Sequence, residues 1–426
     1  MKIRVKESNI DEVLAHPGLK HREPCRQNGF LRALAAALSA GELKEVGFTC
    51  EKEGMERLKP DEPALFLMNH SSFLDLKIAA VLLKERPWHV VCTYDGFVGK
   101  EGLMRAMGCL PARKFITDLP LVQDMRSVTG KLRESVLLFP EASYSFDGTA
   151  TPLPESLGKC IRMLRVPVVM IRTEGAFTRD PLYNGLRLRK VIVRARETVL
   201  FSPEEIASLP LTEINRRLTD AFTFDHFRWQ RENRIRVDEP FRAEGLERVL
   251  YRCPVCGREG LMKGTGTDIA CSGCGATWTL TEFGALAHTG GPRPAAEQAF
   301  DHIPDWYRWE RACVRQEILD GTYAPDLPVR ILVLADTKAV RHVGDGVLHH
   351  GRDGFVLTGC DGRLDYRQAP RASYSLYADY FWYELGDMIS IGNLARQYYC
   401  FPKDQSFPVA KARLAAEELY KIEGSS

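Results

Sequence analysis

The stretch that decides the fold is residues 64–75, Ala-Leu-Phe-Leu-Met-Asn-His-Ser-Ser-Phe-Leu-Asp. Its first five residues, Ala64–Met68, form an apolar run that predicts a buried strand. The next segment, Leu76–Leu83, carries apolar residues at helical spacing. Residues 69–72 therefore lie at a strand-to-helix junction. In an open α/β sheet, such a carboxyl end of a strand is where ligands bind.

His70 and Asp75 are the candidate catalytic residues of this junction. A carboxylate in the first helical turn can accept a hydrogen bond from one imidazole nitrogen and leave the other free as a general base. Of the ten histidines in the chain, only His70 is followed by an aspartate at this spacing. The alternative is that His70 caps the helix or satisfies a polar contact in the core.

Composition and charge indicate an ordinary globular protein. The chain has 426 residues, of which 45% are hydrophobic and 27% charged, with a net charge of +2. This balance argues against a whole-chain nucleic-acid binder. The charged start lacks a secretory signal, and no apolar run approaches the roughly 20 residues of a membrane-spanning helix. We therefore expect a cytoplasmic protein that at most lies on a membrane surface.

Three regions follow from the pattern along the chain. From about residue 60 to 200, apolar strands alternate with helical segments, which predicts an α/β layer fold. A cysteine cluster follows, and from Pro328 short strands separated by turn signals lead to a closing helix, Val409–Tyr420. The expected boundaries are 1–245, 246–290 and 291–426. The strands predicted in the first region are Ala64–Met68, Trp88–Thr93, Val136–Phe139, Val166–Arg172 and Leu188–Arg196.

The last region is predicted to be an antiparallel barrel or sandwich plugged by its closing helix. On topology alone this resembles a pleckstrin-homology-type domain, whose partner the sequence does not identify. Its predicted strands are Val329–Ala335, Val347–His350, Phe355–Gly359, Tyr374–Ala378, Phe381–Leu385, Met388–Ile391 and Arg396–Phe401.

One helix near the N-terminus leaves two interpretations open. Phe30, Leu31, Leu34 and Leu38 fall on one helical face. This face either packs on the next domain or touches lipid at a membrane surface.

Two further segments carry polar or charged side chains that could act together with His70. Glu141, Ser143 and Tyr144 follow the predicted strand Val136–Phe139 and therefore project from the same sheet edge as His70. Arg113 and Lys114 follow a short apolar turn, and they are either solvated surface charges or cations that bind an anionic substrate.

These segments resemble the blocks of the glycerolipid acyltransferase family. The blocks are Asn69-His70-x4-Asp75, the segment Gly108–Arg113, Phe139-Pro140-Glu141, and Val166–Met170, in this order. The resemblance implies transfer of a fatty acyl group from acyl-CoA or acyl carrier protein to a hydroxyl of a lysophospholipid such as lysophosphatidic acid. His70 would deprotonate the hydroxyl and Asp75 would orient His70. The residues implied in substrate binding are Asn69, Ser72, Arg113, Lys114, Glu141, Ser143 and Tyr144.

One departure from the family pattern concerns the acceptor. Tyr144 stands where the family has the arginine taken to contact the acceptor phosphate, and a tyrosine cannot form a bidentate, charge-assisted pair. The basic stretch 159–196 is either a solvated face or a surface for lipid headgroups or the phosphates of the donor. Nucleic acid is not expected as a partner.

Four cysteines predict a metal site. Cys253, Cys256, Cys271 and Cys274 form two Cys-x2-Cys pairs 14 residues apart, which resembles a zinc ribbon. Four thiolates leave no open coordination position, so the zinc would be structural, with iron as the minor alternative. The eight other cysteines are scattered singly and are expected to be reduced.

The function predicted from the sequence is that of a peripheral-membrane acyltransferase of phospholipid metabolism. The competing hypothesis is a binding or scaffold protein at the membrane surface, in which the ribbon and the C-terminal domain carry the function. Its α/β domain would then be catalytically silent.

Overall fold

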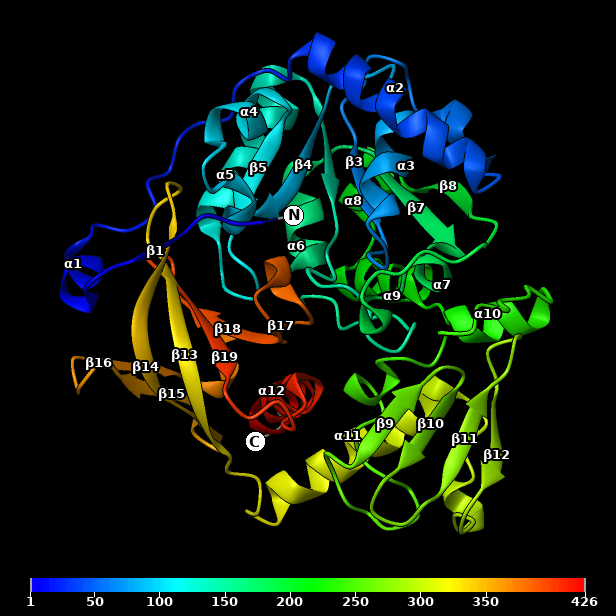
Figure 1. Cartoon of the computed structure of the whole chain (residues 1–426). Helices are drawn as coiled ribbons and strands as arrows, with labels where there is room; N and C mark the ends of the chain where they lie inside the picture. Colours follow the sequence, from blue (N-terminus) through cyan, green and yellow to red (C-terminus); the bar gives the residue numbers. More distant parts are fainter. Residues whose placement is uncertain (1, 425–426) are drawn as a thin grey trace.

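Three β-sheets organise the protein in a computed structural model that describes residues 2–424 (Figure 1). A seven-stranded sheet carries the N-terminal half, a four-stranded sheet follows, and an eight-stranded curled sheet forms the C-terminal part. The α/β domain, the cysteine-bearing ribbon and the all-β domain with its closing helix are thus present in the predicted order. No helix among residues 2–424 is long and apolar enough to cross a membrane.

The seven-stranded sheet is mixed, in the order β2-β8-β7-β3-β6-β4-β5. β3 lies at its centre and pairs in parallel with β6 and β7, and each of its residues is buried because helices cover both faces. β8 runs antiparallel to β7. The strands are β2 (Thr49–Glu53), β3 (Leu65–Met68), β4 (Trp88–Thr93), β5 (Cys109–Ala112), β6 (Ser135–Leu138), β7 (Val168–Glu174) and β8 (Arg194–Phe201).

Helices surround this sheet. They are α2 (Gly29–Glu45), α3 (Leu74–Leu82), α4 (Glu101–Ala106), α5 (Leu119–Ser127), α6 (Leu157–Leu164), α7 (Ala176–Arg179), α8 (Pro203–Ser208), α9 (Leu211–Phe222) and α10 (His226–Glu232). The predicted start of α8 is confirmed: Ser202 and Glu205 form a capping box, with Pro203 at the first helical position.

Helix α2 turns its largest apolar side chains outward. It buries Ala36, Ser39 and Leu43, whereas Phe30 and Leu38 are 74% and 75% exposed. The helix lies on the outer side of the α/β domain, next to α3 (Figure 1). The prediction of a helix packed on the next domain is therefore confirmed, but Ala36, Ser39 and Leu43 make that contact and the face with Phe30 and Leu38 does not.

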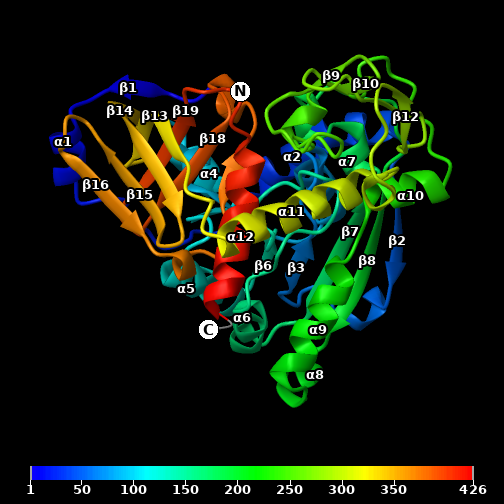
Figure 2. The ribbon, with the colours of Figure 1, turned by 90° about the horizontal axis from the view of Figure 1, so that it is seen from below.

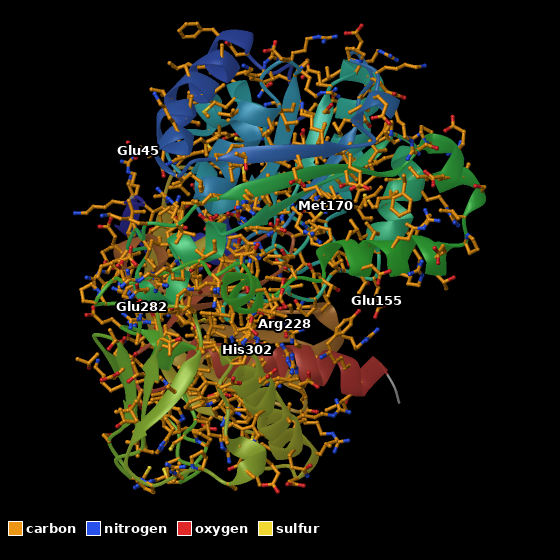
Figure 3. All side chains as sticks on the ribbon, turned by 90° about the vertical axis from the view of Figure 1, so that its right-hand side faces the viewer. Glu45, Glu155, Met170, Arg228, Glu282 and His302 are labelled. Carbon is orange, nitrogen blue, oxygen red and sulfur yellow. The ribbon has the colours of Figure 1, made fainter. Side chains whose placement is uncertain are left out.

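The four-stranded antiparallel sheet is the ribbon. It consists of β9 (Met262–Thr265), β10 (Asp268–Cys271), β11 (Thr277–Leu280) and β12 (Leu286–Gly290). The long helix α11 (Ile303–Leu319) follows it, and the ring centroids of Trp278 and Trp306 lie 4.9 Å apart. At the start of α11, His302 Nε2 lies 2.7 Å from Asp225 Oδ2, next to α10. Figure 3 shows His302 on this junction, below the strand that carries Met170.

The C-terminal sheet has the strand order β16-β15-β14-β13-β19-β18-β17, and helix α12 (Val409–Gly424) follows its last strand. Strands that follow one another along the chain are neighbours from β13 to β16 and from β17 to β19, and the first and last of the seven, β13 and β19, pair with each other. The strands are β13 (Asp326–Leu334), β14 (Val340–Gly351), β15 (Gly354–Gly359), β16 (Leu364–Gln368), β17 (Tyr377–Asp379), β18 (Met388–Gly392) and β19 (Gln397–Pro402).

Two details of the C-terminal sheet differ from the prediction. The predicted strand Phe381–Leu385 is a turn with a short helix, in which Phe381, Tyr383 and Glu384 have positive φ. Trp382 holds this turn because its Nε1 donates to Asp95 Oδ2 at 3.1 Å. The seventh strand is instead β16, which begins immediately after the turn at Asp361 and Gly362.

The N-terminal segment lies on the C-terminal sheet. β1 (Val5–Glu7) pairs in parallel with β14, and the short helix α1 (Ile10–Ala15) packs beside it. The chain then crosses to α2 along the outside (Figure 1). The boundary at residue 245 stays a prediction, but these first residues lie away from the α/β domain.

The C-terminal domain docks against the carboxyl edge of the α/β sheet. Tyr374 donates its hydroxyl to the carbonyl of Pro140, just beyond β6. Arg113, just beyond β5, donates Nε to the carbonyl of Leu394. Helices α11 and α12 pack together between this domain and the ribbon (Figure 2). The edge that binds ligands in α/β sheets is thus shared with the C-terminal domain.

Candidate active site

The carboxyl end of β3 carries the histidine and the carboxylate predicted from the sequence. Asp75 Oδ2 lies 3.2 Å from His70 Nδ1 and accepts hydrogen bonds from the backbone N–H of Ser71 and Ser72 at 2.8 and 3.0 Å. Asp75 is fully buried at the first turn of α3. An imidazole that donates from Nδ1 keeps a lone pair on Nε2, so in this arrangement Nε2 can accept a proton.

Aromatic rings cover both faces of the His70 ring. The centroid of Phe139 lies 4.3 Å and that of Tyr144 4.0 Å from the imidazole centroid, and Tyr144 also stacks on Phe73 at 5.4 Å. Burial lowers the pKa of His70, which the partner Asp75 opposes and the nearby Lys114 favours. The ring is therefore held neutral, the state in which it can accept a proton.

Glu141 joins the ends of two strands. Its Oε2 accepts from the backbone N–H of His70 at 2.9 Å, and its Oε1 accepts from Thr151 N at 2.7 Å and Oγ1 at 3.2 Å. Burial raises the pKa of Glu141 to about 7. Both oxygens are engaged, so Glu141 positions the backbone of His70, and its expected contact with substrate stays a prediction.

Asn69 and Ser72 fasten the loop between β3 and α3. The Asn69 side chain accepts from Thr173 N at 2.8 Å and donates to Thr173 O at 3.3 Å, which ties β3 to β7. Ser72 Oγ donates to Asp180 Oδ1 at 2.5 Å and accepts from Leu74 N at 2.9 Å. Each side chain thus has a structural role in this loop, and a role in substrate binding stays a prediction.

Arg113 is engaged by the protein itself. Its backbone N–H and its Nη1 both bond to the Asp118 carboxylate, at 3.0 and 3.2 Å, and its Nε donates to Leu394 O at 2.8 Å. Its guanidinium lies 4.7 Å from the centroid of the Tyr94 ring. The neighbouring acid and the C-terminal domain therefore hold the arginine expected to bind an acceptor phosphate.

Lys114 is the cation that acts on His70. Its Nζ lies 3.6 Å from the centroid of the Tyr377 ring, and its charge lowers the pKa of His70. Burial lowers the pKa of Lys114 to about 8, against the opposing influence of Asp379 and Asp95. Lys114 thus keeps most of its positive charge at neutral pH, near His70.

The loop that carries Ser143 and Tyr144 receives an arginine from far along the chain. Nη1 of Arg413, on α12, donates to Tyr144 O at 3.1 Å and to Ser143 Oγ at 3.4 Å. Burial raises the pKa of Tyr144 well above its usual range. Tyr144 therefore contributes an uncharged ring to the site, and the positive charge at this loop comes from Arg413.

Three residues of the site carried no signal in the sequence. Thr151 reaches Glu141 across an irregular loop, and Tyr374 and Arg413 come from the C-terminal domain. Neither a motif nor a periodicity pairs residues that lie so far apart along the chain.

The four cysteines of the ribbon converge. Their sulfur atoms all lie within 4.8 Å of one another, with 3.7 Å between Cys253 and Cys274 and 3.8 Å between Cys256 and Cys271. A tetrahedral ion with metal–sulfur bonds of about 2.3 Å has sulfur–sulfur edges of about 3.8 Å. The four side chains therefore fit one tetrahedrally coordinated metal ion and can hold it without rearrangement.

Comparison with known proteins agrees with the geometry at the strand end. A histidine oriented by a carboxylate is an arrangement that can accept a proton from a bound group. Residues 49–173, which contain this pair, match the family model described as Acyltransferase, and this segment is an acyltransferase domain.

Two other comparisons concern curated proteins and solved structures. No curated protein matches the chain. A solved structure, the 1-acyl-sn-glycerophosphate (LPA) acyltransferase PlsC from Thermotoga maritima, is similar at 15% sequence identity and a TM-score of 0.36. The similarity covers 45% of this chain and 76% of that chain, and it is too distant to support an argument about substrate.

Proposed function

We propose that the protein transfers a fatty acyl group from acyl-CoA or acyl carrier protein to a hydroxyl of a lysophospholipid, as a step of phospholipid biosynthesis. The observation that carries the proposal is the His70–Asp75 pair, with Nδ1 bonded and Nε2 left as base, inside a domain of the acyltransferase family.

In the proposed mechanism, His70 Nε2 removes the proton of the acceptor hydroxyl as its oxygen attacks the thioester carbonyl carbon. Asp75 stabilises the imidazolium that forms. The tetrahedral intermediate then expels the sulfur, the C–S bond breaks, and the thiolate takes the proton back from His70. The products are the ester and the free thiol, and no acyl-enzyme intermediate is required.

The test is acyl transfer by purified protein from both donor types to a panel of lysophospholipids. His70→Ala should lower turnover about 10²–10⁴-fold or more, because the general base is lost. His349→Ala is the matched control, since His349 is an exposed histidine paired with Asp326 on the C-terminal sheet. Unchanged turnover in a folded His70→Ala variant would contradict the mechanism.

The competing proposal, a catalytically silent binding protein, has two supporting observations. Phe139 and Tyr144 cover both faces of the His70 ring, and Tyr144 replaces a charged residue of the family pattern. The same assay decides between the two proposals, because a silent protein would show no turnover that depends on His70 with any acceptor.

We also propose that the ribbon holds a structural zinc ion and that the protein works at a membrane surface. The four-thiolate geometry supports the first proposal, since zinc is the usual ion of closed four-cysteine sites. The outward face of α2, with Phe30, Leu34 and Leu38 exposed, supports the second.

A further inference from the structure

A cavity of about 170 Å³ lies where three parts of the chain meet. The segment 146–152 of the α/β domain, the start of α11 and the middle of α12 form its walls. Its charged lining consists of Arg308, Arg311, Arg413, Asp147 and Glu417. Three guanidinium groups thus face two carboxylates in the lining, while Asp305 and Glu418, which do not line the cavity, pair with Arg308 and Arg311.

Arg413 is the buried cation of this cavity. It is 3% exposed, and its guanidinium carbon lies 4.6 Å from the centroid of the Phe146 ring. Its Nη1 donates to Tyr144 O, and its Nε lies 3.3 Å from Glu417 Oε1. Among the described residues, no hydrogen bond involves Nη2. A preoriented guanidinium with an unused N–H face is suited to bind an oxyanion.

The carboxylates of the lining are already shared. Glu417 accepts from Ser375 Oγ at 2.6 Å and pairs with Arg311 Nη2 at 2.7 Å, in addition to Arg413. Asp147 accepts hydrogen bonds from Thr149 N and Oγ1, and burial raises its pKa. Arg311 also pairs with Glu418 at 3.1 Å, whereas among the described residues Glu417 is the one carboxylate paired with Arg413.

Two short connections join the cavity to the catalytic histidine. Thr151, in the cavity wall, is bonded to Glu141, which holds the backbone of His70. Arg413 is bonded to the carbonyl of Tyr144, whose ring lies against His70. One residue thus separates the cavity wall from His70 along either connection.

We infer that this cavity binds a phosphate group and that Arg413, with Arg311, is the anchoring cation. The phosphate is either that of the acceptor's headgroup, an assignment that rests on the proposed function, or that of a soluble phosphate compound. Arg413 then gives the loop at Tyr144 the positive charge that the tyrosine lacks, and the C-terminal helix completes the site.

The direct test titrates inorganic phosphate into the full-length protein by calorimetry. We expect Arg413→Gln to weaken phosphate binding at least tenfold and Arg413→Lys to weaken it less, because a lysine keeps the charge but not the planar guanidinium that Tyr144 and Glu417 orient. Arg236→Gln is the matched control, since Arg236 is exposed, pairs with Glu282 and does not line the cavity. If the Arg413 variants do not fold, Arg308→Gln replaces them in the titration, because Arg308 is a more exposed residue of the lining.

Kinetics distinguish the two sources of phosphate. The wild type and Arg413→Gln are compared with lysophosphatidic acid and with uncharged monoacylglycerol as acceptors. A rise in KM of at least tenfold for lysophosphatidic acid alone identifies the acceptor headgroup. Loss of phosphate binding with the same KM for both acceptors identifies a soluble phosphate compound. Both results support the site.

The inference is overturned if the wild type binds no phosphate, or if Arg236→Gln loses as much affinity as Arg413→Gln. It is judged separately from the proposed function. If the wild type transfers no acyl group to any acceptor, the proposed function fails, and the phosphate titration still decides whether the cavity is a binding site.

Discussion

Glu141 Oε2 lies 2.9 Å from the backbone nitrogen of His70, so a carboxylate at the end of β6 holds the backbone just beyond β3. The same carboxylate accepts from Thr151 through its other oxygen. His70 is therefore held at two places: Asp75 orients its ring and Glu141 its backbone.

Replacing Glu141 tests this second attachment. In Glu141→Gln, the amide NH₂ faces one of the two N–H donors, which leaves a buried donor without an acceptor. We expect a loss of about 1–3 kcal/mol in the free energy of unfolding, together with lower turnover. Urea denaturation measures the first effect. Glu56→Gln, at an exposed residue, should change stability by no more than about 0.5 kcal/mol. Equal stability of the two variants would show that Glu141 does not hold the backbone of His70 in place.

Asp75→Asn separates the charge of this residue from its hydrogen bonds. All three bonds reach Oδ2, and Oδ1 has no hydrogen-bond partner, so an asparagine oxygen can accept the same three bonds. The imidazolium formed during proton transfer then lacks its counter-charge. We expect turnover to fall about 10²-fold or more with little change in KM. A variant with full turnover would show that the charge of Asp75 is dispensable.

The pH dependence should reflect the lowered pKa of His70. Burial lowers this pKa from its ordinary 6.5, and the positive charge of Lys114 lowers it further. A base must be unprotonated, so kcat/KM rises as the pH rises through the pKa and levels off above it. We expect the acid limb to have its midpoint below 6.5. Lys114→Met should move the midpoint upward, and a wild-type midpoint above the ordinary histidine value would contradict this assignment.

Metal analysis tests the ribbon. We expect about one zinc ion per chain, lost in Cys253→Ser, because a closed four-thiolate site needs every ligand. Loss of the ion should also lower the melting temperature, since Cys253 and Cys271 are buried in the core that includes Trp278. Cys25→Ser is the control, at an exposed cysteine outside the cluster. A folded wild type without metal would contradict the proposal.

Vesicle binding tests helix α2. Leu38→Asp places a charge on the outward face and should weaken sedimentation with phosphatidylglycerol-containing vesicles, without lowering the melting temperature. Leu319→Asp, at an exposed leucine at the end of α11, is the control. Equal binding by both variants and the wild type would show that the face of α2 does not contact lipid.

The sequence predicted best what is local in the chain. The junction from β3 to α3, the pair His70 and Asp75, and the four cysteines each depend on short spacing or on a run of apolar residues. The burial of β3 on both faces produces an unbroken apolar pattern, which is why its limits were predicted within one residue.

The elements that were missed are short, polar or dependent on distant partners. β2 is exposed along almost its whole length, and β5 contains Pro111, so neither shows a strand pattern. The strand predicted at Leu188–Arg196 begins at Arg194, because the preceding residues bond to the segments around Arg179 and Glu239. Arg413 reaches Tyr144 only because the C-terminal domain docks on the sheet edge.

The pairing of β1 with β14 has a consequence for how the protein is made. Val5 lies beside Val340, so β1 pairs with a strand that is synthesised much later, after the ribbon and α11. Until then, the α/β domain can form with its N-terminal arm unattached. This arm can therefore attach only after β14 has been synthesised.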